Sequence, residues 1–106
     1  MKKLRVTLFD DNELLRESLA EVISHSEEHE FAGAFPNCLH LADDIIATHP
    51  DVVLMDISMP EMNGIEAVKL LRSHFPDMPV LMQTVFEDDT SVFDAIAAGA
   101  GGYILK

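Results

Sequence analysis

The chain has 106 residues and a formal net charge of −12, from 7 Lys+Arg against 19 Asp+Glu. This length fits one domain, and an apolar fraction of 48% is enough for a single core. So acidic a chain is unsuited to binding DNA, RNA or an anionic membrane by itself. The one cysteine, Cys38, has no partner for a disulfide, which predicts a cytoplasmic location. No apolar run approaches the length of a membrane span.

The first half of the chain alternates predicted strands and helices. Residues 4–9 have strand-like composition. An amphipathic helix with Asp11 or Asn12 as its N-cap is predicted next by an apolar stripe: Leu15, Leu19, Val22 and Ile23. Residues 30–35 form a weaker strand candidate. A second stripe predicts a helix that ends before Pro50: Cys38, Ala42, Ile45 and Ile46.

The second half continues the same alternation. Residues 51–56 include four consecutive apolar residues, which are typical of a strand covered on both faces. A third helical stripe follows: Ile65, Val68, Leu71 and Phe75. Residues 80–83 form a strand with Thr84 at its end, and residues 102–105 form a fifth. Between them a fourth stripe predicts a helix: Val92, Phe93, Ile96 and Ala97. This alternation predicts the α/β class, with a doubly wound parallel sheet of five strands.

Polar residues follow four of the predicted strands: Asp10, Asp11, Asp56, Thr84 and Lys106. In open α/β sheets, ligands bind at the carboxyl ends of the strands, where these residues converge. Crowded carboxylates raise one another's pKa unless a cation compensates. Mg²⁺ suits this need, because it accepts a few protein oxygens and several waters. A carboxylate beside such an ion, with Lys and Thr near it, is equipped to accept a phosphoryl group.

These residues lie in segments that resemble the CheY-like receiver domain of bacterial two-component response regulators: Phe9–Asp11, Asp56–Gly64, Thr84 and Gly102–Lys106. The match runs over essentially the whole chain in the right order and spacing. The resemblance implies a flavodoxin-like strand order of 2-1-3-4-5. Residues 99–106 are more similar to the NarL/FixJ (LuxR-type) subgroup than to the winged-helix subgroup.

The resemblance implies a role for each matched residue. Asp56 would accept a phosphoryl group from a histidine kinase or a phosphotransfer protein. Lys106 would contact the phosphoryl group, and Thr84 and Tyr103 would form the switch that responds to it. The implied ligands of Mg²⁺ are Asp10, Asp11, Asp56 and the backbone carbonyl of Ser58.

The expected function is that of a phosphorylation-activated signal receiver, with only weak phosphotransfer and autophosphatase chemistry of its own. Its expected partners are a kinase, a second copy in a homodimer, and DNA through an output domain. The family has a fifth helix after the lysine, so a chain ending at Lys106 is expected to be a fragment. Apolar surface around strands four and five is then expected to be exposed. Val85 is larger than the small residue common at that position, which predicts slow phosphoryl turnover.

Three alternatives stay open at this point. A pseudo-receiver would bind partners without phosphorylation, although the complete set of five site residues favours phosphorylation. A haloacid-dehalogenase-like phosphatase normally has a second Asp where this chain has Ser58. A nucleotide or flavin binder is disfavoured, because residues 10–12 replace a glycine-rich phosphate loop.

Overall fold

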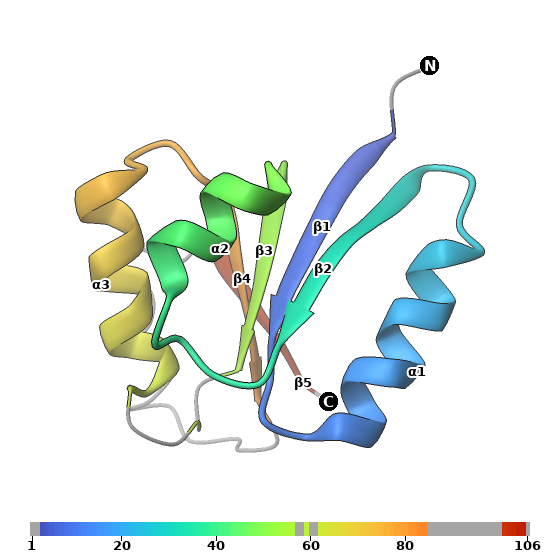
Figure 1. The fold of residues 1–106 in the computed structure, drawn as a ribbon, viewed down its shortest axis with the longest axis horizontal. Helices are drawn as coiled ribbons and strands as arrows, with labels where there is room; N and C mark the ends of the chain where they lie inside the picture. Colours follow the sequence, from blue (N-terminus) through green and yellow to red (C-terminus); the bar gives the residue numbers. More distant parts are fainter. Residues whose placement is uncertain (1–2, 57–58, 60–61, 85–100, 106) are drawn as a thin grey trace.

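The chain folds into a central sheet with helices on both faces (Figure 1). The computed structural model describes residues 3–56, 59, 62–84 and 101–105. The strands are β1 (Leu4–Phe9), β2 (His29–Phe35), β3 (Val52–Asp56), β4 (Val80–Thr84) and β5 (Gly102–Leu105). The helices are α1 (Glu13–Ser24), α2 (Leu41–Thr48) and α3 (Gly64–His74). None of these helices has the length and apolar character needed to cross a membrane.

The strands pair in parallel in the order β2-β1-β3-β4-β5. One face of the sheet is covered by α1, and the other by α2 and α3 (Figure 1). The parallel α/β class and the strand order 2-1-3-4 are therefore confirmed. At the far edge β5 pairs with β4, with Leu81 opposite Gly102. The helix predicted over residues 92–97 lies outside the described residues.

Short polar side chains begin two of the helices. The Asn12 side chain accepts a hydrogen bond from the Leu15 amide, and Asn63 does the same for Glu66. These caps satisfy amides that have no partner within the helix. Of the two N-caps predicted for α1, the structure selects Asn12. Because Asp11 does not cap the helix, its carboxylate can belong to the acidic cluster at the edge of the sheet.

The core lies between the sheet and the pair α2–α3. Its largest fully buried apolar side chains include Phe9, Ile45, Met55 and Leu71. Cys38 is also buried there, as predicted, with its sulfur 3.6 Å from that of Met55. Burial, together with the negative charge of Asp44, raises the pKa of the Cys38 thiol to about 12. The thiol is therefore protonated at neutral pH and acts as a small apolar group.

Not every residue of the apolar stripes predicted for α1 and α2 is buried. Val22 is 68% exposed and Ile46 is also exposed, because periodicity does not show where a neighbouring element ends. On the α1 face the strands are covered incompletely, and a groove of about 300 Å³ runs beside the helix. Its lining residues are Val6, Val22, Ile23, Ser26, His29, Val52, Leu54 and Leu81. The open apolar surface thus includes β4, one of the two strands for which it was predicted, and extends over β1 and β3, while the side chains of β5 lie outside the described structure.

The sheet and α2 approach each other closely at Gly33. The hydroxyl groups of Thr7 and Thr48 are 2.9 Å apart, and the Thr48 hydroxyl donates to the backbone carbonyl of Asp44. This buried pair ties β1 to the end of α2. A Cβ atom added at Gly33 would lie 2.8 Å from the Thr48 Cγ2 atom. Glycine at this position therefore permits the contact between β2 and α2.

Gly33→Ala is expected to destabilise the fold by about 1–3 kcal/mol, the usual cost of overpacking. Thr48→Ser removes the Cγ2 atom and keeps the hydroxyl that bonds Thr7 and Asp44. The loss caused by Gly33→Ala should therefore be much smaller in a Thr48→Ser background. Urea unfolding of the four proteins measures both costs. Equal losses in the two backgrounds would show that this contact is not the cause.

Candidate functional site

Three carboxylates meet where β1 and β3 end. Asp10 directly follows β1 and is 1% exposed, while Asp56 is the last residue of β3 and is 5% exposed. Asp11 is exposed beside them. Each of the three offers a carboxylate oxygen within 4.8 Å of the others. The structure thus brings together the three acids that the sequence placed at neighbouring strand ends.

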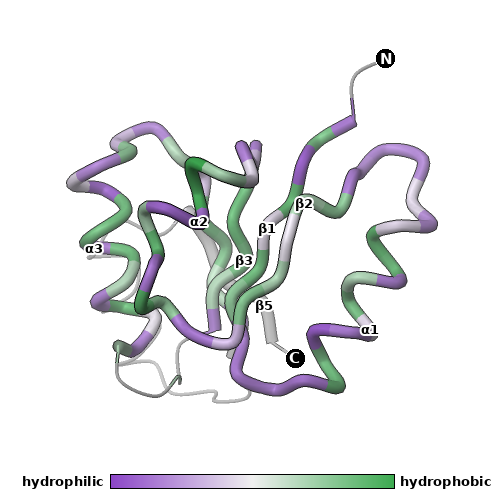
Figure 2. The backbone as a smooth tube through the Cα atoms, in the orientation of Figure 1, coloured by the Kyte–Doolittle hydropathy of each residue, from purple (hydrophilic) through white to green (hydrophobic). Residues whose placement is uncertain are grey.

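The parallel register explains why these acids converge. The last β1–β3 pair is Phe9 with Met55, so Asp10 and Asp56 follow one residue further along neighbouring strands. The order of strands also reverses between β1 and β3, which leaves a crevice at their carboxyl ends. In Figure 2 the strands β1 and β3 are largely hydrophobic, and hydrophilic segments continue from the carboxyl ends of β1 and β2. A polar site at this edge therefore follows from topology and register together.

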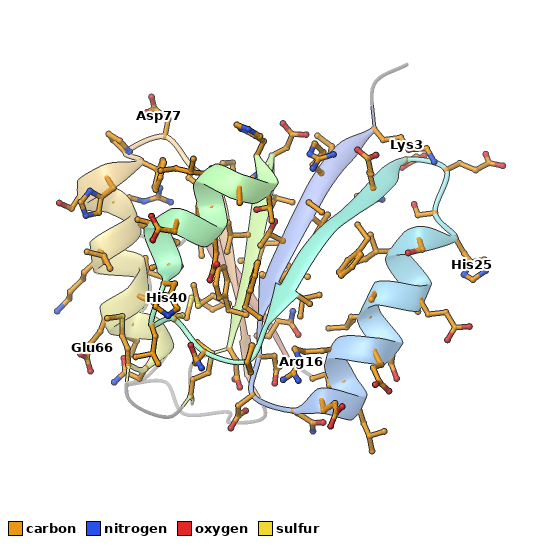
Figure 3. The ribbon with its side chains drawn as sticks, viewed as in Figure 1. Lys3, Arg16, His25, His40, Glu66 and Asp77 are labelled. Carbon is orange, nitrogen blue, oxygen red and sulfur yellow. The ribbon has the colours of Figure 1, made fainter. Side chains whose placement is uncertain are left out.

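Backbone and side-chain hydrogen bonds hold Asp10 in place. The Asn12 amide donates to Asp10 Oδ1 over 2.9 Å, and the Asp10 amide donates to the Phe35 carbonyl over 3.0 Å. Arg16 points from α1 towards the sheet (Figure 3) and donates from Nη1 to the Asp10 carbonyl over 2.8 Å. The first turn of α1 and the end of β2 thus fix the position of this acid. A rigid ligand loses less entropy when it binds a cation.

This donor set fits Mg²⁺. It offers only oxygen atoms, it carries excess negative charge, and it is partly open through Asp11. Within residues 3–56, 59, 62–84 and 101–105, it is the one group of three His, Cys, Asp or Glu residues close enough to share a metal. A bound divalent cation would offset the repulsion among three neighbouring carboxylates.

The remaining predicted site residues are described only in part. Thr84 ends β4, opposite Leu105, and Tyr103 lies in β5, opposite Met82. The backbone thus places both residues at or near the acidic edge, while their side chains lie outside the described structure. The predictions for three other residues lie wholly outside it: Ser58, Val85 and Lys106.

The chain matches the family described as the response regulator receiver domain over residues 6–106. It belongs to this family. The resemblance read from the five site residues and their spacing is therefore confirmed, and with it the place of the chain among two-component signalling proteins.

Relatives and solved structures agree with the predicted subgroup of this receiver domain. It is 37% identical over 103 residues to the transcriptional regulatory protein LnrK of Bacillus subtilis, covering 97% of the chain and 47% of that protein. It is 34% identical to the transcriptional activator DevR/DosR of Mycobacterium tuberculosis, covering 97% and 48%. The receiver domain of the NarL regulator from M. tuberculosis superimposes with a TM-score of 0.91 at 30% identity, covering 99% and 85%. A LuxR-family regulator from Aurantimonas gives 0.92 at 27%, covering 99% and 75%.

The receiver domain spans about half the length of the curated relatives that it matches. The comparison establishes the family and the architecture, which are the properties of the shared half.

Two polar residues of the site were not predicted from the sequence. Arg16 was missed because it lies on a helix whose stripe was read only for apolar residues, although it is six positions after Asp10. Gln83 is buried in β4 beside the acidic edge, with 4% of its surface exposed. An uncharged polar residue within the apolar strand 80–83 was the available signal for Gln83.

Proposed function

We propose that this receiver domain is a phosphorylation-activated signal receiver in which Asp56 is the phospho-acceptor. The observation that carries the proposal is the cluster of Asp10, Asp11 and Asp56, with oxygens within 4.8 Å at the crevice of the sheet. Its phosphodonor is a histidine kinase or a phosphotransfer protein, the partners implied by membership of this family. The cofactor is Mg²⁺, held by the three carboxylates and, as the resemblance implies, the carbonyl of Ser58.

The reaction assigned to Asp56 is the transfer of a phosphoryl group from the donor to its carboxylate. A carboxylate oxygen of Asp56 forms an O–P bond as the bond between phosphorus and the donor breaks, and the donor leaves with that electron pair. Bound Mg²⁺ would supply positive charge against the phosphoryl oxygens. The hydrogen bonds on Asp10 hold one acid in position beside Asp56. The burial of Asp56 limits its access to water.

Phosphorylation is proposed to act through the end of β4 and through β5. The hydroxyl of Thr84 would meet the phosphoryl group together with Lys106, and Tyr103 would then change its position. Support comes from the backbone, which sets Thr84 opposite Leu105 next to the β3 end. A new charge at this edge would shift the balance between two conformations of the same fold.

The output is proposed to be DNA binding by a domain outside the 106 residues. The relatives LnrK and DegU are named transcriptional regulatory proteins, and the chain covers 47% and 44% of their lengths. We further propose a cytoplasmic location, a homodimer, and no metabolic turnover beyond weak phosphotransfer and autophosphatase activity. The net charge of −12 supports assigning DNA contact to a separate domain.

Incubation with Mg²⁺ and acetyl phosphate tests the assignment of Asp56. The expected result is a mass gain of one phosphoryl group, which requires Mg²⁺ and is absent in Asp56→Asn, because the amide lacks the nucleophilic carboxylate oxygen. Intact mass spectrometry measures the gain. Asp77→Asn is the matched control, since Asp77 is an exposed acid in the turn after α3 and should leave phosphorylation unchanged. Folded, Mg²⁺-binding wild type that gains no mass would indicate a pseudo-receiver.

A further inference from the structure

The row of polar side chains at the carboxyl edge continues from β3 into β4. Gln83 is the register partner of Asp56 in the parallel pair β3–β4. Asp56 in turn lies one residue beyond the β1–β3 pair of Phe9 and Met55, as does Asp10. Neighbouring strands are about 4.8 Å apart, and register partners point to the same face. Gln83 therefore stands beside Asp56 on the side away from Asp10.

The strands show which face this row occupies. Leu54 and Leu81, two positions before Asp56 and Gln83, both line the groove beside α1. Because residues two apart in a strand share a face, Asp56 and Gln83 are also directed to the α1 side. Arg16 of α1 reaches the same edge and bonds the carbonyl of Asp10. The carboxamide of Gln83 is thus on the side of the sheet where the acidic cluster is assembled.

Gln83 is a polar residue that is almost fully buried at the end of β4. The side chain is 4% exposed and follows the apolar residues of β4, where an apolar side chain would complete the strand. Within the ranges that the structure describes, none of the hydrogen bonds involves its carboxamide. Since no hydrogen bond among the described residues holds the carboxamide elsewhere, its two N–H donors are available to Asp56 on the neighbouring strand.

We propose that Gln83 is a positioning residue, whose carboxamide donates a hydrogen bond to the Asp56 side chain when the acidic cluster holds its cation. The bond would fix the orientation in which the Asp56 carboxylate meets the cation and the phosphodonor. An amide suits this position because it is a neutral donor, so it orients a carboxylate without competing with the cation as Lys or Arg would. The inference rests on the proposed function, since it concerns the same site.

Mg²⁺ affinity of Gln83→Met, measured by titration calorimetry with Mg²⁺ alone, tests the inference. Methionine preserves the length of the side chain and removes the donors, so the affinity should fall about tenfold, the value of a hydrogen bond to a charged group. Met82→Leu is the matched control, because Met82 is buried in the same strand on the opposite face. It should bind Mg²⁺ like wild type.

Hydrogen exchange of the Gln83 side-chain amide gives a second measurement on the wild type. The NMR signals are assigned in the wild type by through-bond correlation with the Gln83 backbone, and their exchange with solvent should slow about tenfold when Mg²⁺ saturates the protein. This readout needs no folded variant. Affinity of folded Gln83→Met within twofold of wild type, or exchange that Mg²⁺ leaves unchanged, overturns the inference.

These results are separable from a failure of the proposed function. Wild type that binds Mg²⁺ and takes up no phosphoryl group from acetyl phosphate contradicts the function, while the affinity and exchange measurements still decide the role of Gln83. Wild type without measurable Mg²⁺ binding contradicts both proposals.

Discussion

Asp10→Asn is expected to lower the Mg²⁺ affinity about a hundredfold or more, since even outer-sphere partners of a metal are worth roughly 10–100-fold. The change removes a negative charge from a buried ligand position and leaves the size of the side chain unaltered. Asparagine keeps an Oδ1 atom, which still accepts the hydrogen bond from the Asn12 amide. The local backbone should therefore be retained, and titration calorimetry with Mg²⁺ measures the loss.

Asp51→Asn is the control for this experiment. Asp51 is a half-buried acid at the opposite end of β3, and its Oδ2 accepts a hydrogen bond of 2.8 Å from the Arg5 amide. Both variants thus replace one carboxylate that is bonded to a backbone amide. Only the change at Asp10 should weaken Mg²⁺ binding and the phosphorylation that depends on it. Wild-type affinity in Asp10→Asn would exclude this carboxylate as a metal ligand.

Leu71→Ala is expected to reduce the free energy of unfolding by about 2–5 kcal/mol, as is usual for a leucine removed from a core. Leu71 is fully buried where α3 packs on the sheet, in one core with Met55 and Ile45. The truncation would leave a cavity between these layers, because close-packed neighbours relax only in part. Urea unfolding followed by circular dichroism gives the loss.

The same substitution in α1 provides the comparison. Leu14 is 75% exposed in the first turn of that helix, so Leu14→Ala should change the stability by no more than about 0.5 kcal/mol. The two substitutions are chemically the same, so a difference between their effects on stability reports the difference in burial. A similar loss in both variants would mean that Leu14 is covered in solution.

The element pattern and the chemistry of the site could be predicted from the sequence because both depend on local order along the chain. Apolar runs such as residues 52–55 form strands wherever they are covered, and Pro50 ends the helix before them. The three acids follow strands, and a parallel sheet brings the carboxyl ends of its strands to one edge. Asp10, Asp11 and Asp56 could therefore be grouped before any distance was known.

Which side chains of the helices are buried could not be predicted in the same way. Val22 belongs to the stripe of α1 as fully as Ile23 does, but it is mostly exposed. Helical periodicity orients residues relative to one another, whereas their burial depends on how far the sheet extends beneath the helix. Ile46 on α2 differs from the buried Ile45 for the same reason.

By itself, the sequence determined the alternating parallel fold, the family and the acids of the site, because hydrophobic period and residue order are properties of the chain. Only the tertiary structure decided which groups support those acids. Arg16 of α1 donates to the Asp10 carbonyl, and the register of β3 and β4 sets Gln83 opposite Asp56, where it is proposed to act. Register and docking angle arise from contacts between distant segments, so no local pattern in the chain specifies them.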